Sequence, residues 1–141
     1  MMSNGTYVAV KFSADTLLRL QNLQKRAKLN NPLPLEELHA TICYSRNPIH
    51  VVPKVGNKVI AVHGFVENLA TRDGNAVVLR LDSPYLVERH NQLKKLGATH
   101  DFPDYLPHIS LSYDDKSTEE FRLDVLIEMT HEYVEELKDF L

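Results

Sequence analysis

The alternation of apolar and polar residues predicts a strand and then a helix at the start of the chain. Residues 6–12 are rich in β-branched and aromatic side chains, which favour a strand. Ser13 then suits the N-cap of a helix running to about Ala27, because leucines recur at helical spacing over residues 17–23. Residues 38–44 alternate again and are expected to form a second strand.

The middle of the chain has the pattern of two strands, a helix and a further strand. Residues 58–69 and 76–82 have strand character, and the segment Arg72-Asp73-Gly74-Asn75 between them is typical of a hairpin turn. A helix is expected over residues 84–96, because proline is favoured in the first helical turn and a glycine follows the last residue. Residues 106–113 alternate and predict the next strand.

Two patterns overlap in the C-terminal part. Residues 117–120, Ser-Thr-Glu-Glu, have the composition of a helix start. Over residues 125–137 alternate apolar positions favour a strand, whereas a second set at helical spacing favours a helix. Periodicity leaves this choice open. The whole order predicts one α+β domain over residues 1–141, with helices packed against a mixed or antiparallel sheet.

Two of the expected strands repeat one pattern. Residues 39–44 read HATICY and residues 108–113 read HISLSY, so each has a histidine, a hydroxyl residue two places later and a tyrosine five places later. Strand alternation places each histidine and hydroxyl on one face and each tyrosine on the other. The expected polar faces are His39, Thr41 and Cys43 in the first segment and His108, Ser110 and Ser112 in the second.

The amino-acid composition limits the kinds of molecule that the protein is expected to bind. The formal net charge is −3, which argues against a protein that grips long nucleic acid through its phosphates and suits a compact, enclosed ligand. A single cysteine, Cys43, fits a reducing compartment, and packing is the expected role of its thiol rather than nucleophilic attack. The chain shows no signal-peptide pattern and no apolar stretch of bilayer length, so we expect a soluble, cytoplasmic protein without a membrane partner.

No cofactor or metal is expected from the motifs. The chain has no His-x-His, no His-Glu-x-x-His and no Gly-x-x-x-x-Gly-Lys segment, and it lacks a second cysteine. The His131-Glu132 pair lacks the second histidine of a zinc protease site.

The paired segments His39-Ala40-Thr41 and His108-Ile109-Ser110 resemble the two His-x-Thr/Ser motifs of the 2H phosphoesterase superfamily. The resemblance covers nearly the whole chain and implies a two-lobed, pseudo-symmetric fold with a central cleft. More closely, both motifs and the tail over residues 130–137, THEYVEEL, resemble the phage anti-CBASS phosphodiesterases. That resemblance implies metal-independent cleavage of 3′–5′ bonds in cyclic di- or trinucleotide messengers of a bacterial antiphage defence. It also favours a strand over residues 125–137.

Two histidines suit this chemistry, because imidazole exists in both protonation states near neutral pH. We expect one of His39 and His108 to remove a proton from the nucleophile and the other to protonate the leaving oxygen. Thr41 and Ser110 are expected to donate hydrogen bonds to non-bridging phosphate oxygens. As substrate-binding residues we single out Tyr7, which can stack on a base, and Glu136, which can accept from an exocyclic amino group.

Two alternatives remain open from the sequence. The same site suits an enzyme that acts on the 2′,3′-cyclic phosphates of RNA ends, although the acidic net charge weighs against an extended RNA. A non-catalytic protein that sequesters cyclic nucleotides would need hydrogen-bond donors but no acid–base pair. The roles of the two histidines, the base preference and the oligomeric state are not fixed by these patterns.

Overall fold

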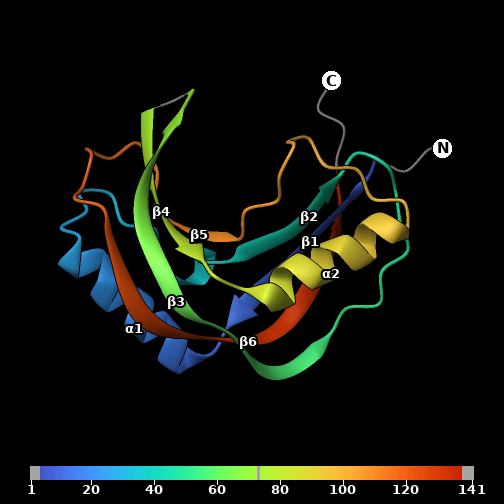
Figure 1. Cartoon of the computed structure of the whole chain (residues 1–141), viewed down its shortest axis with the longest axis horizontal. Coiled ribbons are helices and arrows are strands. Elements are labelled where there is room, and N and C mark those ends of the chain that lie inside the picture. The colour runs from blue at the N-terminus through green and yellow to red at the C-terminus, as the bar shows by residue number, and fades with distance from the viewer. Residues whose placement is uncertain (1–3, 73, 138–141) are drawn as a thin grey trace.

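The structure is a computed structural model that describes residues 4–72 and 74–137. Within these residues it has two α helices, one short 3₁₀ helix and six strands (Figure 1). The elements in chain order are β1 (Thr6–Phe12), α1 (Ala14–Arg26), the 3₁₀ helix η1 (Leu35–Glu37), β2 (Ala40–Ser45), β3 (Val55–Thr71), β4 (Gly74–Leu81), α2 (Pro84–Lys95), β5 (His108–Ser112) and β6 (Phe121–Glu136).

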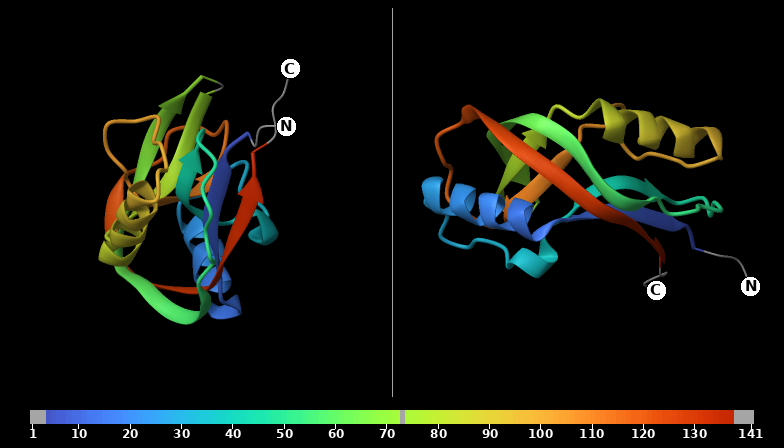
Figure 2. Two further views of the ribbon diagram at one scale, coloured as in Figure 1. Left: turned by 90° about the vertical axis from the view of Figure 1, so that its right-hand side faces the viewer. Right: turned by 90° about the horizontal axis from the view of Figure 1, so that it is seen from below.

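All the strand pairs of the sheet are antiparallel, so of the mixed or antiparallel sheet expected from the sequence the structure has the antiparallel form. The neighbours follow the order β1-β2-β5-β4-β3-β6, and β6 pairs with β1 as well as with β3. The two views of Figure 2 show β6 crossing the molecule from one end to the other. Two lobes result, joined by β6 and by the contact between β2 and β5.

The helix starts expected at Ser13 and Pro84 are confirmed. Ser13 caps α1, because its Oγ accepts a hydrogen bond from the backbone N–H of Thr16 at 3.2 Å. Ser83 caps α2 in the same way through the N–H of Leu86, with Pro84 in the first turn. The chain leaves α2 through Gly97 at a φ of 107°, a conformation that favours glycine. Neither helix in the described part of the chain is long and apolar enough to span a bilayer.

The C-terminal part is a strand, and the helix start expected at residues 117–120 is wrong. Thr118 instead donates its N–H to Asn68 and its hydroxyl to the carbonyl oxygen of Ala27, which ties this segment to the rest of the fold. Strand pairing on both sides of β6 outweighs local helix-start composition. Over residues 121–129 of β6 the alternation holds, since Ile127 is fully buried whereas Leu126 is 42% exposed. It breaks after Met129, where the register against β1 shifts and Glu132 is the next buried residue.

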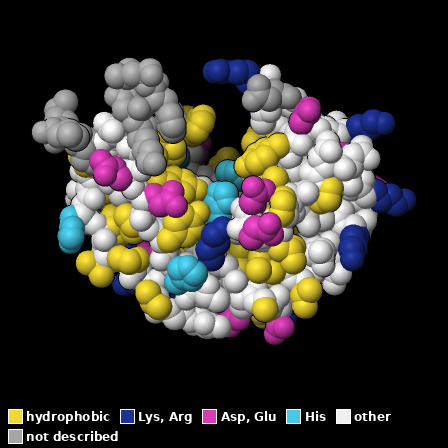
Figure 3. Space-filling model, turned by 180° about the vertical axis from the view of Figure 1, so that it is seen from behind, with side chains coloured by type: hydrophobic (Ala, Val, Ile, Leu, Met, Phe, Trp, Pro, Cys, Tyr) yellow, Lys and Arg dark blue, Asp and Glu magenta, His cyan; other side chains and the backbone are white. Residues whose placement is uncertain are grey.

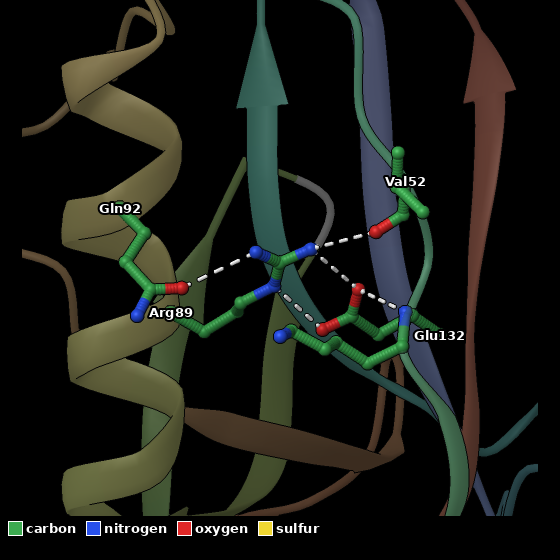
Figure 4. Close-up of polar contacts among 5 residues, drawn as sticks. Val52, Arg89, Gln92 and Glu132 are labelled. Atoms are coloured by element: carbon green, nitrogen blue, oxygen red, sulfur yellow. Dashed lines mark hydrogen bonds and ion pairs between the residues drawn. The ribbon is translucent and has the colours of Figure 1, made fainter.

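A buried ion pair fastens α2 to β6 (Figure 4). Arg89 donates two hydrogen bonds to the Glu132 carboxylate, at 2.8 and 3.0 Å, and both residues are buried. Glu132 also accepts from the N–H of Lys54 at 3.0 Å, and Arg89 donates to the carbonyl oxygen of Val52 at 3.1 Å. These bonds satisfy the two charges and hold the irregular segment before β3 against the sheet.

Candidate active site

The two histidine motifs meet where β2 contacts β5. Ala40 and Ile109, the middle residues of the two motifs, are direct partners in antiparallel register. One residue further along the register in each direction, Thr41 lies opposite His108, and His39 lies opposite Ser110. The four side chains therefore share one face, with each histidine beside the hydroxyl residue of the other motif. Figure 3 shows histidine side chains in a hollow between the two lobes.

Both histidines make the same backbone hydrogen bond. His39 Nδ1 lies 2.8 Å from the carbonyl oxygen of Glu37, and His108 Nδ1 lies 2.9 Å from that of Leu106. Because a carbonyl oxygen only accepts, each Nδ1 must carry the hydrogen. This fixes the ring orientation and leaves Nε2 of both partly exposed imidazoles free to accept or donate a proton.

Each motif strand contains one extra residue, three places after its histidine. In β2 the register moves from Thr41 opposite Ala9 to Cys43 opposite Val8, so Ile42 is a β-bulge. In β5 it moves from Ser110 opposite Val78 to Ser112 opposite Val77, so Leu111 is the corresponding bulge. A bulge reverses the alternation of the residues that follow it.

Because of the bulges, the residues that follow them lie on the opposite faces of their strands from those expected. Cys43 does not share the face of His39, because it lies opposite Val8 in the core and is 1% exposed. Ser112 likewise leaves the face of His108 and is fully buried. Tyr44, expected in the core, is 47% exposed, lies opposite Tyr7 and borders the cleft. Tyr113 follows the same displaced alternation and is 53% exposed.

Thr41 is held from two sides. Its Oγ1 is hydrogen bonded to the hydroxyl of Tyr7 at 2.8 Å, and its carbonyl oxygen accepts from the hydroxyl of Tyr105 at 2.7 Å. Tyr7 also packs edge-on against Tyr44, with ring centroids 6.1 Å apart, and against His39 at 6.4 Å. Burial raises the pKa of Tyr7, so its hydroxyl stays protonated at neutral pH. Tyr7 thus lies beside Thr41 and His39, and the stacking on a base expected of it stays a prediction.

Glu136 lies beside β1 but not on the face of Tyr7. The register pairs Glu136 with Thr6, and it pairs Glu135 with Tyr7. Paired residues share a face, so Glu135 is the acidic residue that follows the cleft side of β6. The substrate contact expected of Glu136 stays a prediction.

A cavity of about 450 Å³ lies beside Thr41 and His108. This volume lies in the range of small-molecule sites. Its walls are the loop over residues 100–106, the end of β2 and the β3–β4 hairpin, and they include His108, Thr41, Tyr44, Arg80 and Glu67.

Two of these wall residues, Arg80 and Glu67, were not predicted from the sequence. Arg80 is the direct cross-strand partner of His108, and its guanidinium forms an ion pair with Glu67. A signal was present, because Arg80 is a lone charge within the aliphatic strand over residues 77–81. Among the side chains that the structure describes, three or more potential metal ligands do not gather at any point.

Comparison with known proteins extends the motif resemblance to the whole chain. The model of the family "Anti-CBASS protein Acb1" matches residues 4–140. The Acb1 protein of Enterobacteria phage T4 is 51% identical over 112 residues, which are 79% of this chain and 74% of that protein. The one from Salmonella phage S16 is 50% identical with the same coverage. That of Vibrio phage KVP40 is 43% identical over 136 residues, 96% of this chain and 89% of that protein.

Solved structures confirm the expected 2H phosphoesterase-like fold. E. coli LigT in its apo form matches with a TM-score of 0.52 at 12% identity, covering 98% of this chain and 96% of LigT. LigT complexed with phosphate matches with a TM-score of 0.53 at 13% identity and the same coverage. With the family model spanning almost every residue and relatives at half identity, the chain belongs to the anti-CBASS protein Acb1 family.

Proposed function

We propose that the protein is a phosphodiesterase that cleaves 3′–5′ bonds of cyclic di- or trinucleotide messengers and thereby counteracts CBASS immunity. One observation carries the chemistry: His39 and His108 are presented by equivalent Nδ1 hydrogen bonds on one face of adjoining strands. A protein that only sequesters its ligand needs no such pair of equivalent, free Nε2 atoms. The biological role in this proposal is inferred from the names of the family and of the relatives.

In the proposed reaction, Nε2 of one imidazole removes a proton from the nucleophile, which is the 2′-hydroxyl or a water. Nε2–H of the other protonates the 5′-oxygen as the P–O5′ bond breaks. Attack by the 2′-hydroxyl leaves a 2′,3′-cyclic phosphate, and attack by water leaves a 3′-phosphate. Thr41 and Ser110 donate to the non-bridging oxygens, each contributing about 3 kcal/mol to transition-state stabilisation. The residues form a symmetric set, so the direction in which the substrate binds decides which histidine is the acid.

The ligand is proposed to be a small cyclic nucleotide and not a long nucleic acid. The cavity has the volume of a small-molecule site, and the net charge of −3 is unfavourable for a polyanion. One hydrophobic core, which contains residues of both helices and all six strands, supports a single domain that acts as a unit. We place its action in the cytoplasm of the infected host.

The test incubates the protein with cyclic dinucleotides, cyclic trinucleotides and 2′,3′-cyclic nucleotides in excess EDTA and analyses the products. Turnover of the cyclic oligonucleotides is expected to persist with the chelator. His39→Ala and His108→Ala are each expected to reduce kcat by about 10²- to 10⁴-fold. His63→Ala is the matched control, because His63 is an exposed histidine on β3 whose partner is Asp124.

Other outcomes would contradict the proposal. Activity that vanishes in EDTA and returns with zinc or manganese would replace the acid–base mechanism by a metal mechanism. Recovery of intact ligand after incubation and denaturation would show sequestration without cleavage. Turnover confined to the 2′,3′-cyclic nucleotides would favour processing of RNA ends.

A further inference from the structure

Each α helix buries two polar side chains that the proposed chemistry does not use, Thr16 and Gln24 in α1 and Arg89 and His90 in α2. Gln24 of α1 is 4% exposed and His90 of α2 is 3% exposed. Burying an amide or imidazole is unfavourable unless its hydrogen-bonding groups find partners. Both residues therefore have to be explained by what they contact.

Both contact the bulge residue of a motif strand. Gln24 Nε2 donates to the carbonyl oxygen of Leu111, the β5 bulge, at 3.0 Å, and to that of Leu33 at 3.0 Å. The Leu111 oxygen also accepts from the backbone N–H of Leu33 at 2.9 Å, so Gln24 supplies its second hydrogen bond. His90 Nδ1 donates to the carbonyl oxygen of Ile42, the β2 bulge, at 2.7 Å. The arrangement is crossed: α1 follows β1 in the chain but holds β5, whereas α2 follows β4 but holds β2.

A bulge residue needs such a partner. The extra residue has no counterpart on the neighbouring strand, so its peptide group leaves the regular ladder. A buried carbonyl oxygen that loses a hydrogen-bond donor is destabilised, and this cost would favour slippage of the strand back into register. Slippage by one residue would turn the side chains on one side of the bulge to the opposite face, either the motif residues before it or the tyrosine after it.

We propose that Gln24 and His90 are positioning residues, which fix the two bulges and thereby the orientation of Thr41 and Ser110 toward the phosphate. The inference rests on the proposed function, because it assigns these residues to the same site. Neither residue touches the substrate. Each acts through the strand that carries one histidine and one hydroxyl residue.

On β2, His90 acts together with Tyr105, and we call this pair of side chains the clamp on β2. The ring of Tyr105 stacks on His90 with centroids 4.1 Å apart and planes 6° apart, and its hydroxyl donates to the carbonyl oxygen of Thr41. Two successive carbonyl oxygens of β2 are thus held by two stacked rings. Burial lowers the pKa of His90, which keeps it neutral with the hydrogen on Nδ1. Tyr105 also places the cavity loop over residues 100–106 against the strand.

The kinetic test removes each donor while keeping the size of the side chain. In Gln24→Met and His90→Leu, kcat is expected to fall about ten- to a hundredfold, because small displacements of reacting groups carry such a cost. KM is expected to change less than about twofold, since the positioned hydroxyls act mainly on the transition state. His90→Asn retains an N–H near the position of Nδ1 and should restore most of kcat. Gln21→Met on α1 is the matched control for Gln24.

Rates are expressed per mole of folded protein, from near-UV circular dichroism and unfolding curves. Lower stability with unchanged kcat in both donor-free variants would show a purely structural role and overturn the inference. So would equal losses of kcat in His90→Leu and His90→Asn. Absence of turnover by the wild-type protein would instead refute the proposed function.

A measurement on the wild-type protein tests the clamp without any substitution. Imidazole ¹H–¹⁵N NMR spectra should show His90 as the Nδ1–H tautomer, with a slowly exchanging proton, between pH 7 and 8. The Nε2–H tautomer, or fast exchange of the ring proton, would overturn the clamp at β2. This measurement does not require turnover, so it remains decisive even if a donor-free variant does not fold.

Discussion

Tyr44 lies on the same side of β2 as Thr41, although an unbroken strand would place residues three apart on opposite faces. The bulge at Ile42 causes this, and the equivalent bulge at Leu111 does the same for Tyr113 relative to Ser110. Tyr44 is therefore a cleft residue. Its ring centroid lies 6.1 Å from that of Tyr7, and the ring forms part of the cavity wall.

Tyr44→Ala is expected to raise KM for a cyclic oligonucleotide about tenfold, because stacking of a base on an aromatic ring contributes about 1–3 kcal/mol. The urea midpoint of unfolding should change little, since the side chain is about half exposed. Steady-state kinetics and urea titration measure the two effects. Tyr44→Phe, which keeps the ring, should behave like the wild type. A drop in stability with unchanged KM in Tyr44→Ala would place the ring in the core after all.

Cys43 is expected to be unreactive in the folded protein. Burial raises the pKa of its thiol to about 11, so only about a thousandth of it is thiolate at pH 8. Alkylation by iodoacetamide at pH 8 should therefore be far slower than for a free cysteine, and it should accelerate to the free rate in 8 M urea. Cys43→Ala should retain turnover. Rapid alkylation of the native protein with loss of activity would show that the Cys43 thiol lies in the active site.

Glu132→Gln is expected to lower the free energy of unfolding by about 3–5 kcal/mol, because it leaves the Arg89 guanidinium buried without its counter-charge. Urea denaturation followed by circular dichroism measures the change. Asp101→Asn is the control: its ion pair with Arg46 lies on the surface, and its removal should leave the midpoint nearly unchanged. Equal effects of the two substitutions would contradict the structural role assigned to the buried pair.

Asp115 gives the stability of the protein a pH dependence. Burial alone would raise the pKa of its carboxyl group, but the N–H groups of Asn30, Asn31 and Lys116 donate to it and hold the pKa below its usual range. A depressed pKa in the folded state means that the stabilisation is complete above the unfolded pKa, near 3.9, and is lost as pH falls through the folded value.

The unfolding free energy of the wild type should therefore decline below about pH 4 more steeply than that of Asp115→Asn. Urea midpoints measured at intervals from pH 7 to pH 2 test this. Asp114→Asn is the neighbouring control, because that side chain is exposed. Parallel pH profiles for the wild type and Asp115→Asn would contradict the assignment.

Local patterns predicted most of the elements correctly, because they act over short distances. The caps at Ser13 and Ser83 and the stop before Gly97 depend on backbone groups within one helical turn. The error at residues 117–120 has the opposite cause. This short polar segment is compatible with a helix start by its composition. Its hydrogen bonds to Asn68 and Ala27, which lie far away in sequence, hold it in a non-helical conformation.

The sequence by itself determined the two His-x-hydroxyl motifs, their strands and the family to which they point, since these are properties of residue type and near spacing. The tertiary structure alone decided the pairing of Ala40 with Ile109, the bulges at Ile42 and Leu111 and hence the faces of Cys43 and Tyr44. A bulge is defined by the register against a neighbouring strand and is held by donors such as Gln24 and His90 from distant helices. Such a feature has no local energetic signature, so no window of the sequence could contain it.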